Sequence, residues 1–194
     1  MTAREVATIA IRTCQWAHIF QIQVRRFWED WYRESDGYYP WDGDDENSIF
    51  VGDRIFMISA IQHVIDGLVC LKDELLSRGE SGEKIERILN NIVGGDIKNN
   101  LKLLRNMNEH DIQYISKKGR KQNQFESLVS KNQVNYYTNA HWTIEDRKNG
   151  NFFIGNIDLR ALEDSVKEQI GNIDKMCSKI CYKYYFLDEN VKER

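Results

Sequence analysis

Apolar residues recur at intervals of three or four along most of this chain, and this spacing constrains the fold more than any other feature. The repeat runs through residues 3–34, about 48–78 and about 159–184. Such spacing places the apolar side chains on one face of an α-helix. Only one proline, Pro40, occurs in the 194 residues, so long helices meet almost no interruption. The sequence therefore predicts several long helices that pack through their apolar faces.

Turn-forming residues divide these helices from one another. The acidic, glycine- and proline-containing stretch 35–47 predicts a loop, and SRGESGE at 77–83 ends the second helix and begins a short third one. The tripeptide GGD at 94–96 predicts a stop and a restart, with Asp96 as the N-cap of a helix over about 97–117.

A β-hairpin is expected between the fourth helix and the last one. The segments NQVNYYTNAHWTIED and NFFIGN are rich in strand-forming residues and flank RKNG, which is typical of a hairpin turn. Asp158 then predicts the N-cap of the last helix. We therefore expect one domain over 1–194, mainly α: an up-and-down bundle of four to five helices with a β-hairpin inserted at about 133–156.

Composition places the chain among soluble globular proteins. Charged residues make up 29% and hydrophobic residues 41%, and the formal net charge is −3, too small to argue for or against a partner. The N-terminal residues do not resemble a secretion signal, and no apolar run is expected to approach membrane-spanning length. We expect a cytoplasmic protein with no membrane contact.

Two patterns resemble metal sites without completing one. Cys177 and Cys181 are one helical turn apart, but no nearby pair of ligands completes the set, so reduced, buried thiols are expected. The acidic residues of 42–53 fall at calcium-loop offsets. However, Asn47 replaces the glycine of the sharp turn and Asp53 replaces the closing glutamate, which favours a solvated turn. We expect no metal and no other cofactor.

The helix over 97–117 carries two apolar faces. The core face consists of Ile97, Leu101, Leu104, Ile112 and Ile115. The second face consists of Leu103, Met107, His110 and Tyr114. Two apolar faces indicate that the helix is covered on both sides, either by another helix of this chain or by an identical subunit, which we favour. Asn106 lies one turn before His110, at the border of the second face.

Arg105 lies roughly 140° from His110 around a straight helix, so the two side chains do not share a face. Either the helix is irregular there, or a site that contains both is assembled between two chains. The simpler alternative is that Arg105 makes a surface ion pair with Glu109.

The stretch R-N-M-N-E-H, from Arg105 to His110, resembles the motif of the HEPN superfamily, an arginine and a polar residue followed by a histidine on a late helix of an α-bundle. The resemblance covers about residues 48–118. The bare Arg-to-His spacing also occurs at Arg12 and His18. The second copy is favoured because it has asparagine after the arginine, a later helix and an apolar second face.

The resemblance implies a metal-independent endoribonuclease that cleaves single-stranded RNA at a composite site of a homodimer. It also implies a prokaryotic setting: a toxin of a toxin–antitoxin pair, or an effector of abortive infection or antiviral defence, with an antitoxin or another defence protein as partner. Arg105, Asn106 and His110 would be the catalytic residues. The RNA 2′-OH would attack the adjacent phosphorus, which leaves a cyclic phosphate and a 5′-OH.

A basic run follows the motif helix. It consists of Lys117, Lys118, Arg120 and Lys121. These side chains would bind backbone phosphates, or alternatively they only complement the helix dipole at its C-terminal end.

A second hypothesis needs no chemistry: a non-catalytic helical module that dimerises or binds a partner through the second face. The remaining histidines, His18, His63 and His141, are expected to be structural. Asp66 and Glu74 of the second helix could support a site, although the sequence does not select either.

Overall fold

The computed structural model describes residues 1–34, 45–94, 101–102, 106, 118, 120, 123, 143–146, 151–154 and 157–191. The helices within these residues are α1 (Ala3–Glu34), α2 (Asp45–Ser77), α3 (Glu83–Ile92) and α7 (Leu159–Val191). The strands are β1 (Thr143–Asp146), β2 (Asn151–Ile154) and β3 (Ile157–Asp158). The prediction of a mainly α protein with an inserted hairpin is confirmed.

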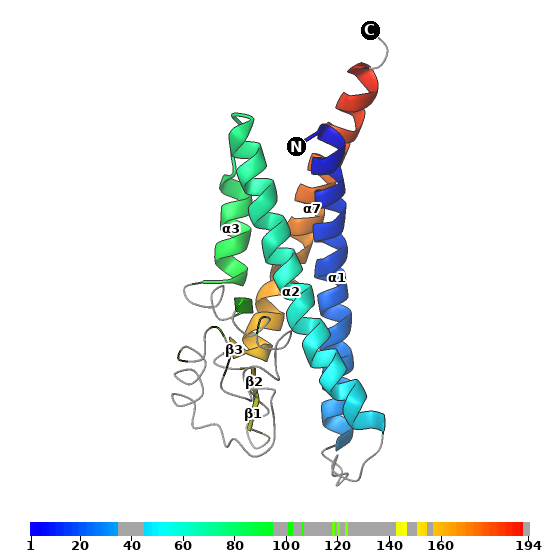
Figure 1. The fold of residues 1–194 in the computed structure, drawn as a ribbon, viewed down its shortest axis with the longest axis vertical. Helices are drawn as coiled ribbons and strands as arrows, with labels where there is room; N and C mark the ends of the chain where they lie inside the picture. Colours follow the sequence, from blue (N-terminus) through cyan, green and yellow to red (C-terminus); the bar gives the residue numbers. More distant parts are fainter. Residues whose placement is uncertain are drawn as a thin grey trace.

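The four helices form an up-and-down bundle. Helix α1 contacts α2 and α7, and α3 contacts the same two helices. Figure 1 shows that α1 and α3 run in one direction and α2 and α7 in the other. The amino group of Met1 lies 3.4 Å from the carboxylate of Glu74 near the end of α2, as expected for antiparallel neighbours.

The core lies where the apolar faces of the helices meet. The predicted stripe of α7 is confirmed by residues that are at most 7% exposed: Leu159, Leu162, Val166, Ile173, Cys177, Ile180 and Tyr184. From α1 the largest fully buried side chains are Phe20 and Phe27, and α2 contributes Ile61, Ile65, Leu68 and Leu71. Burial of these aromatic and branched side chains is the main force that holds the bundle together.

Helix α2 is more apolar than a one-sided surface helix. Its segment Ile55–Ser77 has a mean hydropathy of 1.5 and, within the part of the chain that the structure describes, is long and apolar enough to span a membrane by length and composition. The expectation that no such run exists is therefore wrong. Half of its most apolar window is buried inside the bundle.

Backbone hydrogen bonds end α2 and a side chain begins α7 at the predicted positions. Gly79 adopts a left-handed conformation with φ of 73°. The amide of Glu80 then donates to the carbonyl of Leu75 at 2.8 Å, which is the Schellman arrangement. At the start of α7, the carboxylate of Asp158 accepts a hydrogen bond from the amide of Arg160 at 2.9 Å, so the predicted N-cap is confirmed.

The predicted hairpin is observed over its two central strands. Strand β1 pairs antiparallel with β2, and Asp146 lies opposite Asn151. The turn between them and residues 133–142 lie outside the described residues. Strand β3, which the sequence did not predict, pairs with β2 and leads directly into α7.

Aromatic side chains fix this sheet to the bundle. Phe152 of β2 is fully buried, and its ring centroid lies 4.6 Å from that of Phe27. The next residue of α1, Trp28, donates its indole N–H to Glu163 of α7 at 2.7 Å. The guanidinium of Arg160 lies 4.3 Å from the centre of the Trp28 ring. The end of α1, the sheet and the start of α7 are therefore joined at one end of the bundle (Figure 1).

Candidate functional site

Three residues of the predicted 97–117 helix are described, and all three are helical: Leu101, Lys102 and Asn106. Leu101 is only 1% exposed, whereas Lys102 is exposed and Asn106 is half-buried. The burial of Leu101 agrees with its place on the predicted core face. The second face and the arrangement of the motif residues stay predictions.

Leu101 attaches this helix to the bundle. It lines a small pocket together with residues that include Phe20 of α1, Ile58 and Ile61 of α2, and Leu159 of α7. Every side chain that lines the pocket is apolar. The pocket offers no polar group to a substrate, so its role is packing.

The other predicted site residues are only partly described. Arg105, His110, Lys117 and Lys121 lie outside the described residues. Two members of the basic run, Lys118 and Arg120, are described and both are exposed. The catalytic assignment of Arg105, Asn106 and His110 therefore stays a prediction, as does phosphate binding by the basic run.

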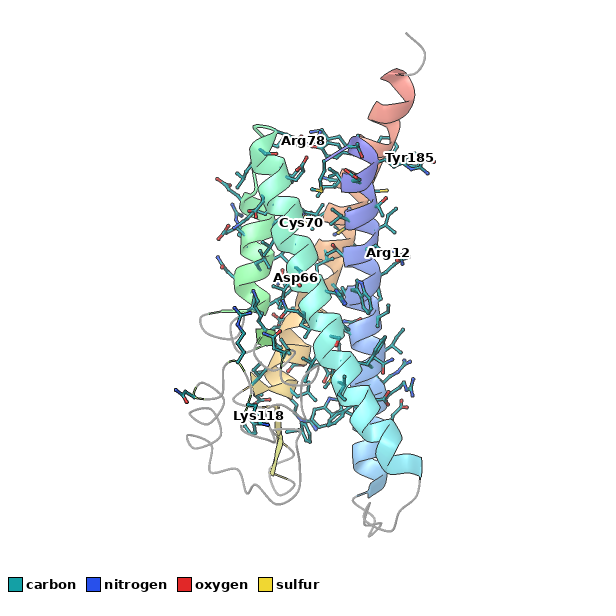
Figure 2. The ribbon with its side chains drawn as sticks, viewed as in Figure 1. Arg12, Asp66, Cys70, Arg78, Lys118 and Tyr185 are labelled. Atoms are coloured by element: carbon teal, nitrogen blue, oxygen red, sulfur yellow. The ribbon has the colours of Figure 1, made fainter. Side chains whose placement is uncertain are left out.

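Asp66 is the better of the two acidic side chains that could support a site on α2 (Figure 2). It is exposed and accepts a hydrogen bond at 2.8 Å from the amide of Gln62, a side chain that is only 3% exposed. The Oε1 atom of Gln62 is buried and has no hydrogen-bond partner among the described residues. Glu74, by contrast, accepts hydrogen bonds from Arg78, and this bonding lowers the pKa of its carboxyl group.

An uncompensated buried acceptor costs about 1–3 kcal/mol. Gln62 follows Ile61 directly, and Ile61 lines the pocket that holds Leu101. Gln62 itself is not among the residues that line this pocket.

The other copy of the Arg-to-His spacing does not form an arginine–histidine pair. Arg12 donates to Gln15 at 3.4 Å on its own helix. His18 instead lies 3.0 Å from a carboxylate oxygen of Asp174 on α7. The two side chains therefore have different partners.

The remaining histidines have different surroundings. The ring of His63 stacks on that of Trp16 with centroids 4.4 Å apart, which is a packing contact between α1 and α2. His141 lies outside the described residues.

All four cysteines are free thiols, as expected. Cys177 is 2% exposed, and burial raises its pKa to about 12, so it is protonated and unreactive near neutral pH. Cys181 is half-buried. The sequence expectation of reduced thiols inside the last helix is confirmed.

The acidic stretch 42–53, which resembles a calcium-binding loop in sequence, is largely helical in the structure. Helix α2 already begins at Asp45, so most of the 42–53 stretch is helical. Asp53 is 7% exposed, and its carboxylate lies 3.4 Å from the guanidinium of Arg26. A buried carboxylate that is paired with a cation in a helix cannot close a calcium loop.

Comparison with known proteins gives no relative: no family model matches the chain, and no curated protein or solved structure is significantly similar to it.

Proposed function

We propose that this chain is a HEPN-like endoribonuclease that acts as a cytoplasmic homodimer on single-stranded RNA. The R-N-M-N-E-H motif of the sequence is what carries the proposal. Two described residues are compatible with it: Leu101, which is helical and buried, and Asn106, which is helical and half-buried. By resemblance, the biological setting is a prokaryotic toxin or defence effector, with an antitoxin or another defence protein as regulator.

The residue types of the motif suit cleavage of RNA by its own 2′-OH. His110 takes the proton from the 2′-OH or gives one to the leaving 5′-oxygen, since imidazole titrates near neutral pH. The 2′-oxygen bonds to phosphorus as the bond from phosphorus to the 5′-oxygen breaks. Arg105 stabilises the charge on the phosphorane oxygens with two parallel hydrogen bonds, and Asn106 orients the ring of His110 or holds the phosphate.

A second subunit completes the site in this proposal. Arg105 and His110 are roughly 140° apart on one helix, so residues of two chains are needed to bring the two functions to one phosphate. The apolar second face around Met107 is the surface on which the chains meet. Lys118 and Arg120 are exposed, as phosphate-binding residues must be, and with Lys117 and Lys121 they hold the RNA backbone.

The test is cleavage of a labelled single-stranded RNA by the purified protein in EDTA. We expect fragments that end in a cyclic phosphate, and no cleavage of DNA of the same sequence. His110→Ala should lose about 10²–10⁴-fold in rate, which is the usual contribution of general acid–base catalysis. Arg105→Ala should also lose activity.

The matched control is Arg87→Ala, because Arg87 is 79% exposed and makes only a 3.6 Å surface pair with Glu83. This variant should cut as fast as the parent chain. Cleavage by His110→Ala at the parent rate would refute the catalytic assignment.

The alternative is a non-catalytic module that dimerises or binds a partner through the same second face. It predicts no cleavage under any condition, together with a changed assembly state of Met107→Asp in sedimentation equilibrium. The ribonuclease proposal predicts that Met107→Asp loses both the dimer and the cleavage.

A further inference from the structure

A cluster of three possible metal ligands lies between α1 and α7. The thiol of Cys14 lies 3.1 Å from the Oδ1 atom of Asp174, and the Nε2 atom of His18 lies 3.0 Å from the same oxygen. All three ligand atoms lie within 4.8 Å of one another. The ribonuclease proposal does not use this cluster, although Cys14 also packs against the hydrophobic core.

The packing of α1 against α7 brings these three side chains together. Cys14 and His18 are four residues apart, so they project from the same face of α1. Asp174 comes from α7, which packs along α1 in the opposite direction. The cluster therefore joins two helices that are distant in sequence, and its position is fixed by the buried residues of both.

The spacing is close to that of a tetrahedral zinc site. With metal–ligand distances of about 2.3 Å to sulfur and about 2.0–2.1 Å to nitrogen and oxygen, ligand atoms are separated by about 3.3–3.6 Å. The observed contacts of 3.0 and 3.1 Å would open by a few tenths of an ångström to admit the ion. Thiolate, imidazole and carboxylate together are a ligand set that suits Zn²⁺.

Solvent reaches one side of the cluster and protein closes the other. The side chains of His18 and Asp174 are 51% and 40% exposed. Cys14 is half-buried. An ion between these three ligands would therefore face water at its fourth position.

Without a bound ion, the cluster contributes little to the stability of the bundle. The contact between His18 and Asp174 is an exposed surface pair, and such pairs contribute little to stability. Burial, followed by the hydrogen bond to Asp174, raises the pKa of the Cys14 thiol to about 11.

We propose that Cys14, His18 and Asp174 bind one Zn²⁺ ion, with water as the fourth ligand, and that the ion fastens α1 to α7. The site is separate from the motif around His110 and does not depend on ribonuclease activity. Its role is to stabilise the bundle.

The test is a titration of the purified, metal-free chain with Co²⁺, which substitutes for zinc and reports thiolate ligation through a charge-transfer band in the near ultraviolet. We expect the band to saturate at one ion per chain and to disappear when Zn²⁺ is added. Cys14→Ser should abolish the band, and Asp174→Asn and His18→Gln should each weaken binding at least tenfold.

The control is Cys70→Ser. Cys70 lies on α2 (Figure 2), whereas the proposed ligands lie on α1 and α7, so this variant should bind the ion as the parent does. Zinc at a hundredfold excess over its Kd should raise the Tm of the parent by about 5–10 °C and leave that of Cys14→Ser unchanged. Far-ultraviolet circular dichroism of each metal-free variant checks that it is folded. A parent chain without the cobalt band, or a Cys14→Ser variant that keeps it, would overturn the proposal.

Discussion

Helices α1 and α2 lie close together at Gly67, and this contact gives a quantitative prediction about the stability of the bundle. A Cβ atom added at Gly67 would lie 2.1 Å from Oγ1 of Thr13, 3.1 Å from its Cβ and 3.3 Å from its Cγ2. Thr13 is 1% exposed, and its hydroxyl donates to the carbonyl of Ile9 at 2.8 Å. Ordinary carbon contacts require about 3.5–4.0 Å, so Gly67→Ala must push the two helices apart.

Two opposing effects decide how far Gly67→Ala changes the free energy of unfolding. Alanine favours the helix over glycine by about 1 kcal/mol. Overpacking a buried contact costs about 1–3 kcal/mol, and a separation of only 2.1 Å from a branched, buried side chain belongs at the upper end. The net loss in the free energy of unfolding is therefore about 2 kcal/mol. In a chain of this size, that loss lowers Tm by about 4–8 °C.

The matched control is Gly171→Ala on α7, where a new Cβ would have nothing within 4 Å. There only the helix propensity changes, so Tm should rise by about 2–4 °C. Thermal and urea unfolding followed by circular dichroism measure both variants. Adding Thr13→Ala to Gly67→Ala should recover about 1–2 kcal/mol through the interaction between the two sites. If Gly67→Ala were as stabilising as Gly171→Ala, the close approach of α1 and α2 at this point would be wrong.

Two further changes probe single contacts. The pKa of Glu80 is lowered because it accepts hydrogen bonds from Lys183 and Tyr184. Its stabilising contribution is therefore complete above the unfolded pKa of about 4.3 and is lost as pH falls through the lower folded pKa. Between pH 6 and pH 3 the Tm of the parent should accordingly fall further than that of Glu80→Gln, and equal slopes in a pH series of melting curves would refute this role. Asp158→Ala removes the N-cap of α7 and should cost about 1 kcal/mol in urea unfolding, whereas Asp158→Asn keeps the acceptor and should cost much less; equal losses in both variants would contradict the cap.

The fold was predictable wherever one physical rule acted over a long stretch. The apolar stripe of α7 and its cap at Asp158 follow from the helical period and from the unpaired amides at a helix start. Strand β3 could not be predicted in this way, because the two residues Ile157–Asp158 are too few to show an alternation. The start of α2 at Asp45 was also missed, since its first residues are polar and give no apolar period, although acids are favourable near a helix N-terminus.

The zinc candidate shows why sites between helices are hard to read from sequence. Cys14 and His18, one turn apart, were the only local signal, and this half-site resembles the Cys177 and Cys181 spacing, which the structure shows as free thiols. The third ligand, Asp174, is 156 residues from His18 in sequence. Nothing but the packing of α7 on α1 brings it near, so the site depends on contacts that no spacing rule contains.

The same reasoning separates the two copies of the arginine-to-histidine spacing. In neither copy do the arginine and the histidine share a face of an ideal helix. Arg12 and His18 are six residues apart, which corresponds to a rotation of about 240°, and Arg105 and His110 are five apart, which corresponds to about 140°. Around His18 the structure supplies a different partner, Asp174 from another helix of the same chain. In the function proposed above, the second apolar face at Met107 is covered by a second subunit, which also brings a second set of motif residues to His110. Spacing therefore cannot identify the ribonuclease motif by itself, and the surface on which each histidine lies is the property that distinguishes the copies.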